Sequence, residues 1–185
     1  MSSPLLAALR QRTAPLHARL DAALNDAPPT RASYVAFLRA TLAAQRRVLP
    51  AIARWIARPD DAQRLASLRA DLAALDAAPH DEAPVDELTL PPAGAYGAAY
   101  VVEGSTLGGL VLAERFEAAL GLPPDTATRY LRLHGRDTAA RWRAFLADLS
   151  QVADPVAHEE ACQAAIAAFE AYRAAFVAHG VIRDD

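Results

Sequence analysis

The chain contains no lysine, and all 19 of its basic side chains are arginines. Its net charge of −3 provides no excess of positive charge to attract nucleic acid or an anionic membrane. The single cysteine, Cys162, excludes a disulfide within the chain and is typical of a reducing cytoplasm. We expect Cys162 to be a small buried thiol. Any carboxylate ligand must be held by arginine, which can bind it with two parallel hydrogen bonds.

Long apolar runs are missing as well. No segment reaches the roughly 18 uninterrupted apolar residues of a transmembrane helix, and the N-terminus lacks the basic and apolar regions of a signal peptide. We therefore expect a cytoplasmic protein. Aromatic residues make up only 6% of the chain, whereas alanine, the best helix former, is abundant. The composition predicts an all-α fold, and the length of 185 residues favours one domain spanning residues 1–185.

Helical spacing and capping residues predict six to eight helices and no strand, which indicates a compact helical bundle. The expected helices span about 5–24, 31–58, 61–75, 93–120, 125–133, 138–152 and 155–179. The predicted N-caps are Thr30, Asp60 or Asp61, Asp137 and Asp154. Pro15 and Pro50 are expected to kink or restart the first two helices, with Thr13 as a cap of the restarted first helix. Four prolines between residues 76 and 92 predict a surface loop.

The most informative segment is an apolar run from Tyr100 to Leu112 that contains three glycines. Gly104 and Gly108 are one helical turn apart and share a face, and Gly109 follows directly. Each glycine inside a helix costs about 1 kcal/mol relative to alanine. A face without side chains lets a flat ligand approach the backbone, and it lets the helix bend. The same spacing also permits close packing of two helices, so both interpretations stay open.

His17 lies far upstream on an apolar helix, and Arg10, Thr13 and Asp21 share its face. A neutral imidazole nitrogen is a good iron ligand, and the other ring nitrogen then needs a polar partner. Arg10 precedes His17 by two turns, about 10 Å along the helix axis, which matches the reach from a haem iron to a propionate. Together with the bare glycine face, the pattern favours a haem sandwiched between two helices. The alternative is an ordinary amphipathic helix with His17 at its rim.

Two further segments are ambiguous. In the first, Arg141 and Arg143 flank Trp142. The two arginines are either part of a solvated face, with Trp142 in the core, or part of a site. In the second, Phe169 and Phe176 lie two turns apart on the last helix, a spacing more typical of core than of a pocket. The sequence contains none of four common functional motifs: a nucleophile elbow, a P-loop, paired cysteines and the paired Glu-x-x-His of di-iron bundles. Three other histidines are expected to be exposed: His80, His134 and His179.

On these segments the chain resembles the haem oxygenases, most closely the bacterial branch associated with bacteriophytochromes. The resemblance rests on the segment from Arg10 to His17 and on the Val-Glu-Gly-Ser-Thr-Leu-Gly-Gly run that ends at Gly109. It implies a haem-oxygenase-like bundle that opens haem oxidatively to biliverdin and releases iron and carbon monoxide. Haem is then both substrate and oxygen-activating cofactor. An external electron donor such as a ferredoxin or a flavin reductase is required, and a bacteriophytochrome is a candidate acceptor of biliverdin.

The resemblance also implies roles for individual residues. His17 would be the proximal iron ligand, and Gly104, Ser105 and Gly108 would form the catalytic distal side. The implied haem-binding residues are Arg10, Thr13, Tyr100, Gly104, Gly108, Gly109, Arg143, Phe169 and Phe176. Arg143 would bind a propionate, or Arg141 would if the alignment slips. Ser105 stands where some family members carry an aspartate that organises water, so that water must be ordered by backbone groups or by another side chain.

Two other functions stay open beside this one. A haem-binding or haem-storage protein on the same fold would have the same ligand and pocket without turnover. A hydrolase similar to thiaminase II would share the bundle but needs a nucleophilic cysteine among acidic residues. Cys162 follows His158, Glu159 and Glu160, and no acidic cluster faces it in the sequence, which disfavours the hydrolase.

Overall fold

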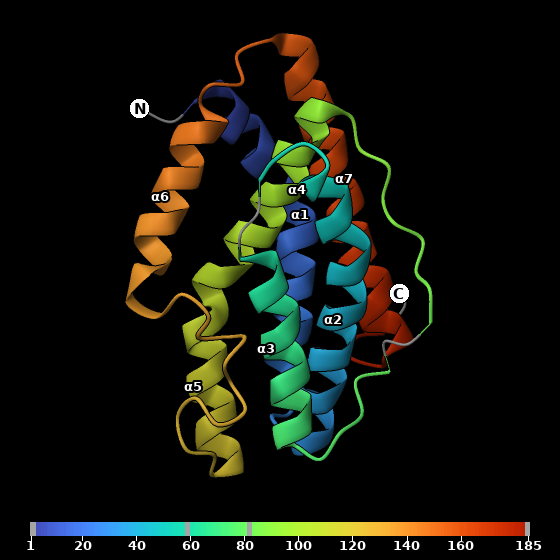
Figure 1. Cartoon of the computed structure of the whole chain (residues 1–185), viewed down its shortest axis with the longest axis vertical. Coiled ribbons are helices and arrows are strands. Elements are labelled where there is room, and N and C mark those ends of the chain that lie inside the picture. Colours follow the sequence, from blue (N-terminus) through green and yellow to red (C-terminus); the bar gives the residue numbers. More distant parts are fainter. Residues whose placement is uncertain (1–2, 58–59, 81–82, 184–185) are drawn as a thin grey trace.

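Seven α-helices and two short 3-10 helices, with no strand, make up the computed structural model in the residues that it describes, 3–57, 60–80 and 83–183. Their bounds are α1 (Pro4–Asp26), α2 (Arg31–Ala53), α3 (Asp61–Ala74), α4 (Pro92–Ser105), η1 (Thr106–Gly108), α5 (Gly109–Leu120), η2 (Gly135–Asp137), α6 (Thr138–Leu149) and α7 (Pro155–Ala178). The predicted all-α bundle is confirmed (Figure 1). Within the described ranges, no helix combines the length and the hydropathy needed to cross a membrane.

Helix α7 is the centre of the bundle, because it packs against α1, α2 and α4 (Figure 1). Helix α3 packs on α2, and α6 stands at the side, where it contacts α4 and α1. The buried face of α7 is rich in alanine, including Ala161, Ala165 and Ala168. Small side chains let neighbouring backbones approach closely, so α4 and α7 lie near each other.

Helix α4 approaches α7 closely at Gly97. A Cβ at this position would lie 1.8 Å from the carbonyl oxygen of Ala161, far inside van der Waals contact. Gly94, one turn earlier, is similarly crowded by Pro91 and Ala164. These two glycines therefore serve helix packing, which the sequence pattern did not single out.

We expect Gly97→Ala to destabilise the fold by about 3 kcal/mol, since the added methyl group must push α4 away from α7. Denaturant unfolding followed by circular dichroism measures this. Gly108→Ala is the matched control, because nothing lies within 4 Å of a Cβ at Gly108. A Gly97→Ala protein as stable as the control would show that the two helices do not meet as described.

The helix caps are only partly as predicted. Thr30 accepts a hydrogen bond from the backbone amide three residues later, and Asp154 accepts one from the amide two residues later, so both caps are confirmed. Asp60 and Asp137 occupy the N-cap positions of α3 and α6, as predicted, but neither makes a capping bond with its side chain. Asp60 instead lies 2.5 Å from the guanidinium of Arg141 and ties the start of α3 to α6.

Helices α1 and α2 each have a proline in their interior and continue through it. Pro15 lies inside α1 and Pro50 inside α2, and neither helix restarts there. Thr13 is not an N-cap, since its hydroxyl donates to the carbonyl of Leu9 at 2.8 Å within the same helix. The second helix was expected to reach about Arg58, but α2 ends at Ala53 and residues 54–57 are not helical. Arg58 itself lies outside the described residues.

The helix predicted over residues 125–133 is also wrong, since this segment forms turns. Two of its backbone amides are bonded to a distant side chain: the carboxylate of Asp71 accepts from the amides of Arg129 and Tyr130 at 3.0 and 2.9 Å. Burial raises the pKa of Asp71, although these two bonds act in the opposite direction. A buried acid on α3 thus holds the middle of the segment against the bundle, while Arg132 and Leu133 keep local backbone bonds.

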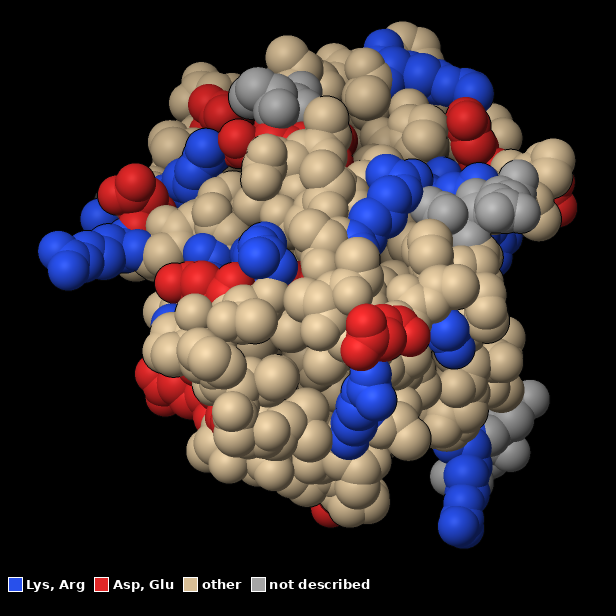
Figure 2. All heavy atoms as spheres, turned by 60° about the horizontal axis from the view of Figure 1, so that its bottom comes forward, with Lys and Arg blue, Asp and Glu red and all other residues tan. Residues whose placement is uncertain are grey.

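The predicted surface loop between α3 and α4 is confirmed in its described part, and it runs along the outside of the bundle in Figure 1. Arginines of α2 hold it there. Arg39, Arg46 and Arg47 each donate to a backbone carbonyl of the loop, at 2.8, 2.8 and 3.0 Å. On the face that Figure 2 presents, arginines and acids alternate with uncharged surface, and neither sign forms a continuous stripe.

Candidate functional site

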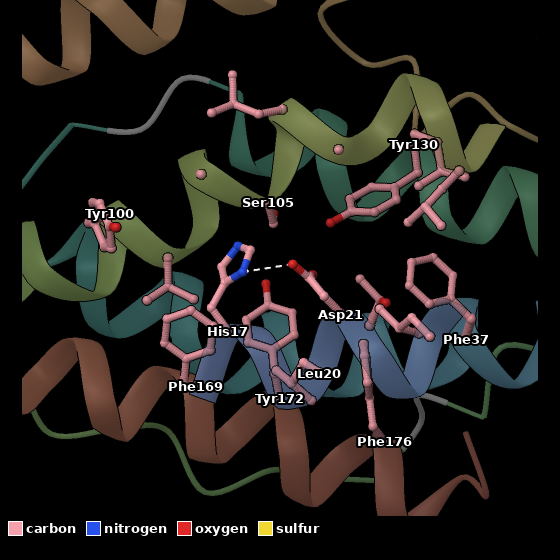
Figure 3. Close-up of a pocket in the computed structure, with 18 of the residues that line it drawn as sticks. His17, Leu20, Asp21, Phe37, Tyr100, Ser105, Tyr130, Phe169, Tyr172 and Phe176 are labelled. Atoms are coloured by element: carbon pink, nitrogen blue, oxygen red, sulfur yellow. Dashed lines mark ion pairs between the residues drawn. The ribbon is translucent and has the colours of Figure 1, made fainter. Parts of the chain in front are cut away.

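A cavity of about 560 Å³ lies between α1 on one wall and the α4–η1–α5 segment on the other. Figure 3 shows its lining residues converging from these helices and from α7. Its volume falls within the roughly 300–1,000 Å³ of small-molecule sites. Most of the lining side chains are apolar or aromatic: Leu20, Leu24, Phe37, Tyr100, Val101, Leu107, Leu112, Leu131, Trp142, Phe169, Tyr172 and Phe176. Such a lining suits a large apolar ligand with few polar groups.

His17 projects from α1 into this cavity, and its ring orientation is held by two neighbours (Figure 3). Its Nδ1 lies 2.8 Å from Oδ2 of Asp21, one turn later on the same helix. The ring of Phe169 meets the imidazole edge-on, with 6.0 Å between ring centroids. A carboxylate can only accept, so Nδ1 carries the proton and the lone pair of the neutral ring is on Nε2. Nε2 is therefore the nitrogen that can bind a metal.

The opposite wall is broken at its glycines, as the sequence allowed: α4 and α5 are joined by the 3-10 turn η1. A Cβ at Gly108 would meet nothing within 4 Å, and one at Gly104 would meet only the ring of Trp142, at 3.8 Å. A Cβ at Gly109 would lie 2.4 Å from the carbonyl oxygen of Leu131. Gly104 and Gly108 thus present bare backbone to the cavity, whereas Gly109 permits close packing.

Most of the predicted site residues line the cavity: Arg10, His17, Tyr100, Gly104, Ser105, Gly108, Phe169 and Phe176. Thr13 and Gly109 do not line it; Thr13 is buried beside the cavity wall in α1. Arg143 is exposed on α6, next to the cavity-lining Trp142. Arg141, the alternative to Arg143, is paired with Asp60 and lines a smaller, separate pocket.

Sequence reasoning missed several lining residues. Leu20 and Leu24 follow His17 by three and seven positions, and Tyr172 lies between the two predicted phenylalanines of α7, so helical spacing could have found them. The sequence favours neither a core position nor a cavity position for Trp142, which lines the cavity. Tyr130 comes from the segment that was expected to be helical, and no local signal pointed it toward the cavity.

Polar side chains, among them Tyr130, lie in the cavity near Ser105, on the wall opposite His17 (Figure 3). The Tyr130 hydroxyl accepts a hydrogen bond from Nε2 of Gln45 at 2.6 Å. Burial raises the pKa of Tyr130, so its hydroxyl stays protonated. Oγ1 of Thr41 and Oε1 of Gln45 are buried without a hydrogen-bond partner among the described residues. Thr41 lines the cavity, whereas Gln45 does not. Since buried polar groups are normally satisfied, the wall at Thr41 suits a small polar ligand held inside the cavity.

The remaining histidines and the cysteine lie outside the cavity lining. His80 is exposed, as expected, but His134 and His179 are half-buried, contrary to the prediction. His134 lies 3.2 Å from the guanidinium of Arg64, and burial together with this charge lowers its pKa. Cys162 is buried, and burial raises the pKa of its thiol. A protonated, buried thiol is a poor nucleophile, which argues against the hydrolase alternative.

The fold and the cavity define a haem-oxygenase-like bundle. A crystal structure of the NO- and CO-bound heme oxygenase from Neisseria meningitidis superposes with a TM-score of 0.81, over 96% of this chain and 92% of that one, at 24% identity. A comparison with curated proteins finds no match. The family model described as heme oxygenase matches residues 3–178. This chain therefore belongs to the haem oxygenase family, as the sequence resemblance predicted, and haem is the compound on which that family acts.

Proposed function

We propose that this protein opens haem to biliverdin, with release of iron and carbon monoxide. The observation that carries the proposal is the pairing of His17 Nε2 on one cavity wall with bare backbone at Gly104 and Gly108 on the other. Family membership supports the same reaction class. We further propose that residues 1–185 form one haem oxygenase domain.

The cavity fits haem in shape and polarity. A flat, mostly apolar ring needs an apolar slot, and the aromatic side chains of Tyr100, Phe169 and Phe176 line this one. Arg10 lines the cavity and would bind one propionate, and Arg143, at the surface of α6, is the candidate for the other. Bound haem would supply both the iron that activates oxygen and the ring that is cleaved.

Thr13 and Gly109 would contribute indirectly. Thr13 is bonded within α1, and Gly109 sets the distance between α5 and Leu131. Both would shape the walls of the site without touching haem.

Asp21 would hold the His17 ring and increase the basicity of Nε2. We expect Asp21→Ala to weaken hemin affinity about 10- to 100-fold, the usual cost of losing such a partner of a metal-binding histidine. An absorbance titration with hemin measures the change. Asp26→Ala, an exposed acid at the end of the same helix, is the control and should leave the affinity unchanged. Equal affinities of the two variants would remove Asp21 from the site.

Tyr130 would hold a proton at its hydroxyl on the distal wall, where other family members use an aspartate. Gln45 donates to this oxygen, so the hydroxyl hydrogen is not needed for that bond and would be the one donated toward a ligand in the cavity. We expect Tyr130→Phe to slow turnover about 100-fold, as for loss of a general acid, with hemin affinity unchanged. Tyr96→Phe, on α4 but outside the cavity, is the control. Turnover of Tyr130→Phe at the wild-type rate would exclude this role.

We also propose that electrons come from an external donor such as a ferredoxin or a flavin reductase. A cytoplasmic location and a bacteriophytochrome as acceptor of biliverdin stay predictions.

Titration of the protein with hemin, followed by reductant in air with catalase present, tests the proposed function. We expect a saturable histidine-type Soret band that then decays to the spectrum of biliverdin. A band that persists with chemical reductant and with ferredoxin and its reductase would indicate a haem-binding protein without turnover. The absence of any saturable band would refute a haem site altogether.

A further inference from the structure

Arg115 of α5 binds the end of α1. Its Nη1 donates to the carbonyl of Leu24 at 2.8 Å, and its Nη2 donates to the carbonyls of Asn25 at 3.1 Å and Ala27 at 2.5 Å. The last carbonyls of a helix have no partner within the helix and carry partial negative charge. Helix α1 has no basic residue in its own last turn. Arg115 therefore supplies from another helix the cation that this helix end lacks.

This contact joins the two opposite walls of the cavity. His17 and Leu24 line it from α1, whereas Gly108 and Leu112 line it from the segment that continues into Arg115. In Figure 1 the last turns of α1 and α5 lie at the same lower end of the bundle. Arg10 lies on α1 two turns before His17, and Leu24 lies two turns after it. The contact thus lies next to Leu24, at the end of the cavity opposite to Arg10.

The two walls are otherwise anchored to different partners. Helix α1 packs mainly on α7. Helix α5 is held by Phe116, whose ring stacks on Tyr34 of α2 with 4.2 Å between centroids, and by Gly109 against Leu131. These anchors hold each wall to other elements, and the hydrogen bonds of Arg115 join the two walls to each other at this end.

We propose that Arg115 is a positioning residue that fixes the width of the cavity at its apolar end and so controls how long haem stays bound. This inference rests on the proposed function, because haem is the ligand whose release it governs. The guanidinium is suited to the task, since its planar fork reaches several carbonyls at once and keeps its charge at all physiological pH values.

The test measures haem loss from hemin-loaded protein to excess apomyoglobin. We expect Arg115→Gln to release haem at least about tenfold faster than wild type, the change that loss of one hydrogen bond from a charged donor produces. Arg115→Lys, which keeps the charge but not the fork, should fall between the two. Arg39→Gln is the matched control, because Arg39 also donates to a backbone carbonyl but lies away from the cavity. Its rate should equal that of wild type, and thermal unfolding of the ligand-free variants should differ little.

Hydrogen exchange of ligand-free protein supplies a readout that does not depend on haem. Arg115→Gln should accelerate exchange in the last turn of α1, and Arg39→Gln should not. If wild type binds hemin but Arg115→Gln releases it no faster than Arg39→Gln, the inference about Arg115 fails and the proposed function stands. If wild type takes up no hemin, the proposed function fails, and control of haem release by Arg115 fails with it. If Arg115→Gln does not fold, Arg115→Lys decides: a release rate equal to that of wild type overturns the inference.

Discussion

Replacement of His17 by alanine is expected to remove the histidine-type haem spectrum and to reduce turnover by more than about 100-fold. Removal of a residue that only supports a metal ligand already reduces activity by up to about 100-fold. Removal of the ligand itself should reduce turnover by more than that. The fold should be unaffected, because the His17 side chain is 59% exposed and its loss leaves no cavity in the core. Absorbance spectra of the hemin complex and single-turnover assays measure the two effects.

Two controls make the His17 result specific. His80→Ala removes an exposed loop histidine and should leave spectrum and turnover unchanged. Added imidazole should restore the histidine-type spectrum of His17→Ala, since the truncated side chain leaves room for a free ring beside Asp21. A His17→Ala protein with the wild-type spectrum would mean that another residue binds the iron.

Replacement of Gly108 by leucine is expected to lower hemin affinity about 10- to 100-fold while leaving the fold intact. The side chain would project into the cavity, and overfilling of a packed site costs about 1–3 kcal/mol, with each 1.4 kcal/mol equal to a factor of ten. In the protein without ligand, the new Cβ meets nothing within 4 Å. Replacement of a helical glycine should even stabilise the chain, by up to about 1 kcal/mol.

The informative comparison is between neighbouring positions. Val111→Leu places the same side chain on the outer face of α5, where Val111 is 70% exposed, and should change neither affinity nor stability. Gly109→Ala should instead destabilise the fold, because its Cβ would meet the carbonyl of Leu131. If Gly108→Leu binds hemin as wild type does, the bare backbone at Gly108 does not face the ligand. Hemin titration and thermal unfolding of the three variants give the result.

Local signals predicted the parts of the fold that local interactions form. The caps at Thr30 and Asp154 follow from nearby residues, and the structure has them. The glycine run allows the expected helix over 93–120 to bend, and in the structure η1 divides that helix into α4 and α5. The helix expected at 125–133 fails for the opposite reason. Two of its central amides are bonded by Asp71, more than fifty positions away, and no pattern within the segment could reveal that partner.

The residues of the candidate site likewise fall into those that local sequence patterns could identify and those that depend on long-range contacts. His17, Gly104 and Gly108 could be found because helical spacing places them on defined faces, and family resemblance assigned them roles. Tyr130 could not be found, since a long-range contact brings a non-helical segment to the cavity. The packing role of Gly109 was equally hidden, because it depends on the carbonyl of Leu131 from the same segment.

The most direct test of the central claim is a crystal structure of the hemin complex. The account predicts that Nε2 of His17 binds the iron, that Nδ1 stays bonded to Asp21, and that the opposite haem face lies against Gly104 and Gly108. An iron bound by any other residue, or a haem outside the cavity between α1 and the glycine segment, would contradict it.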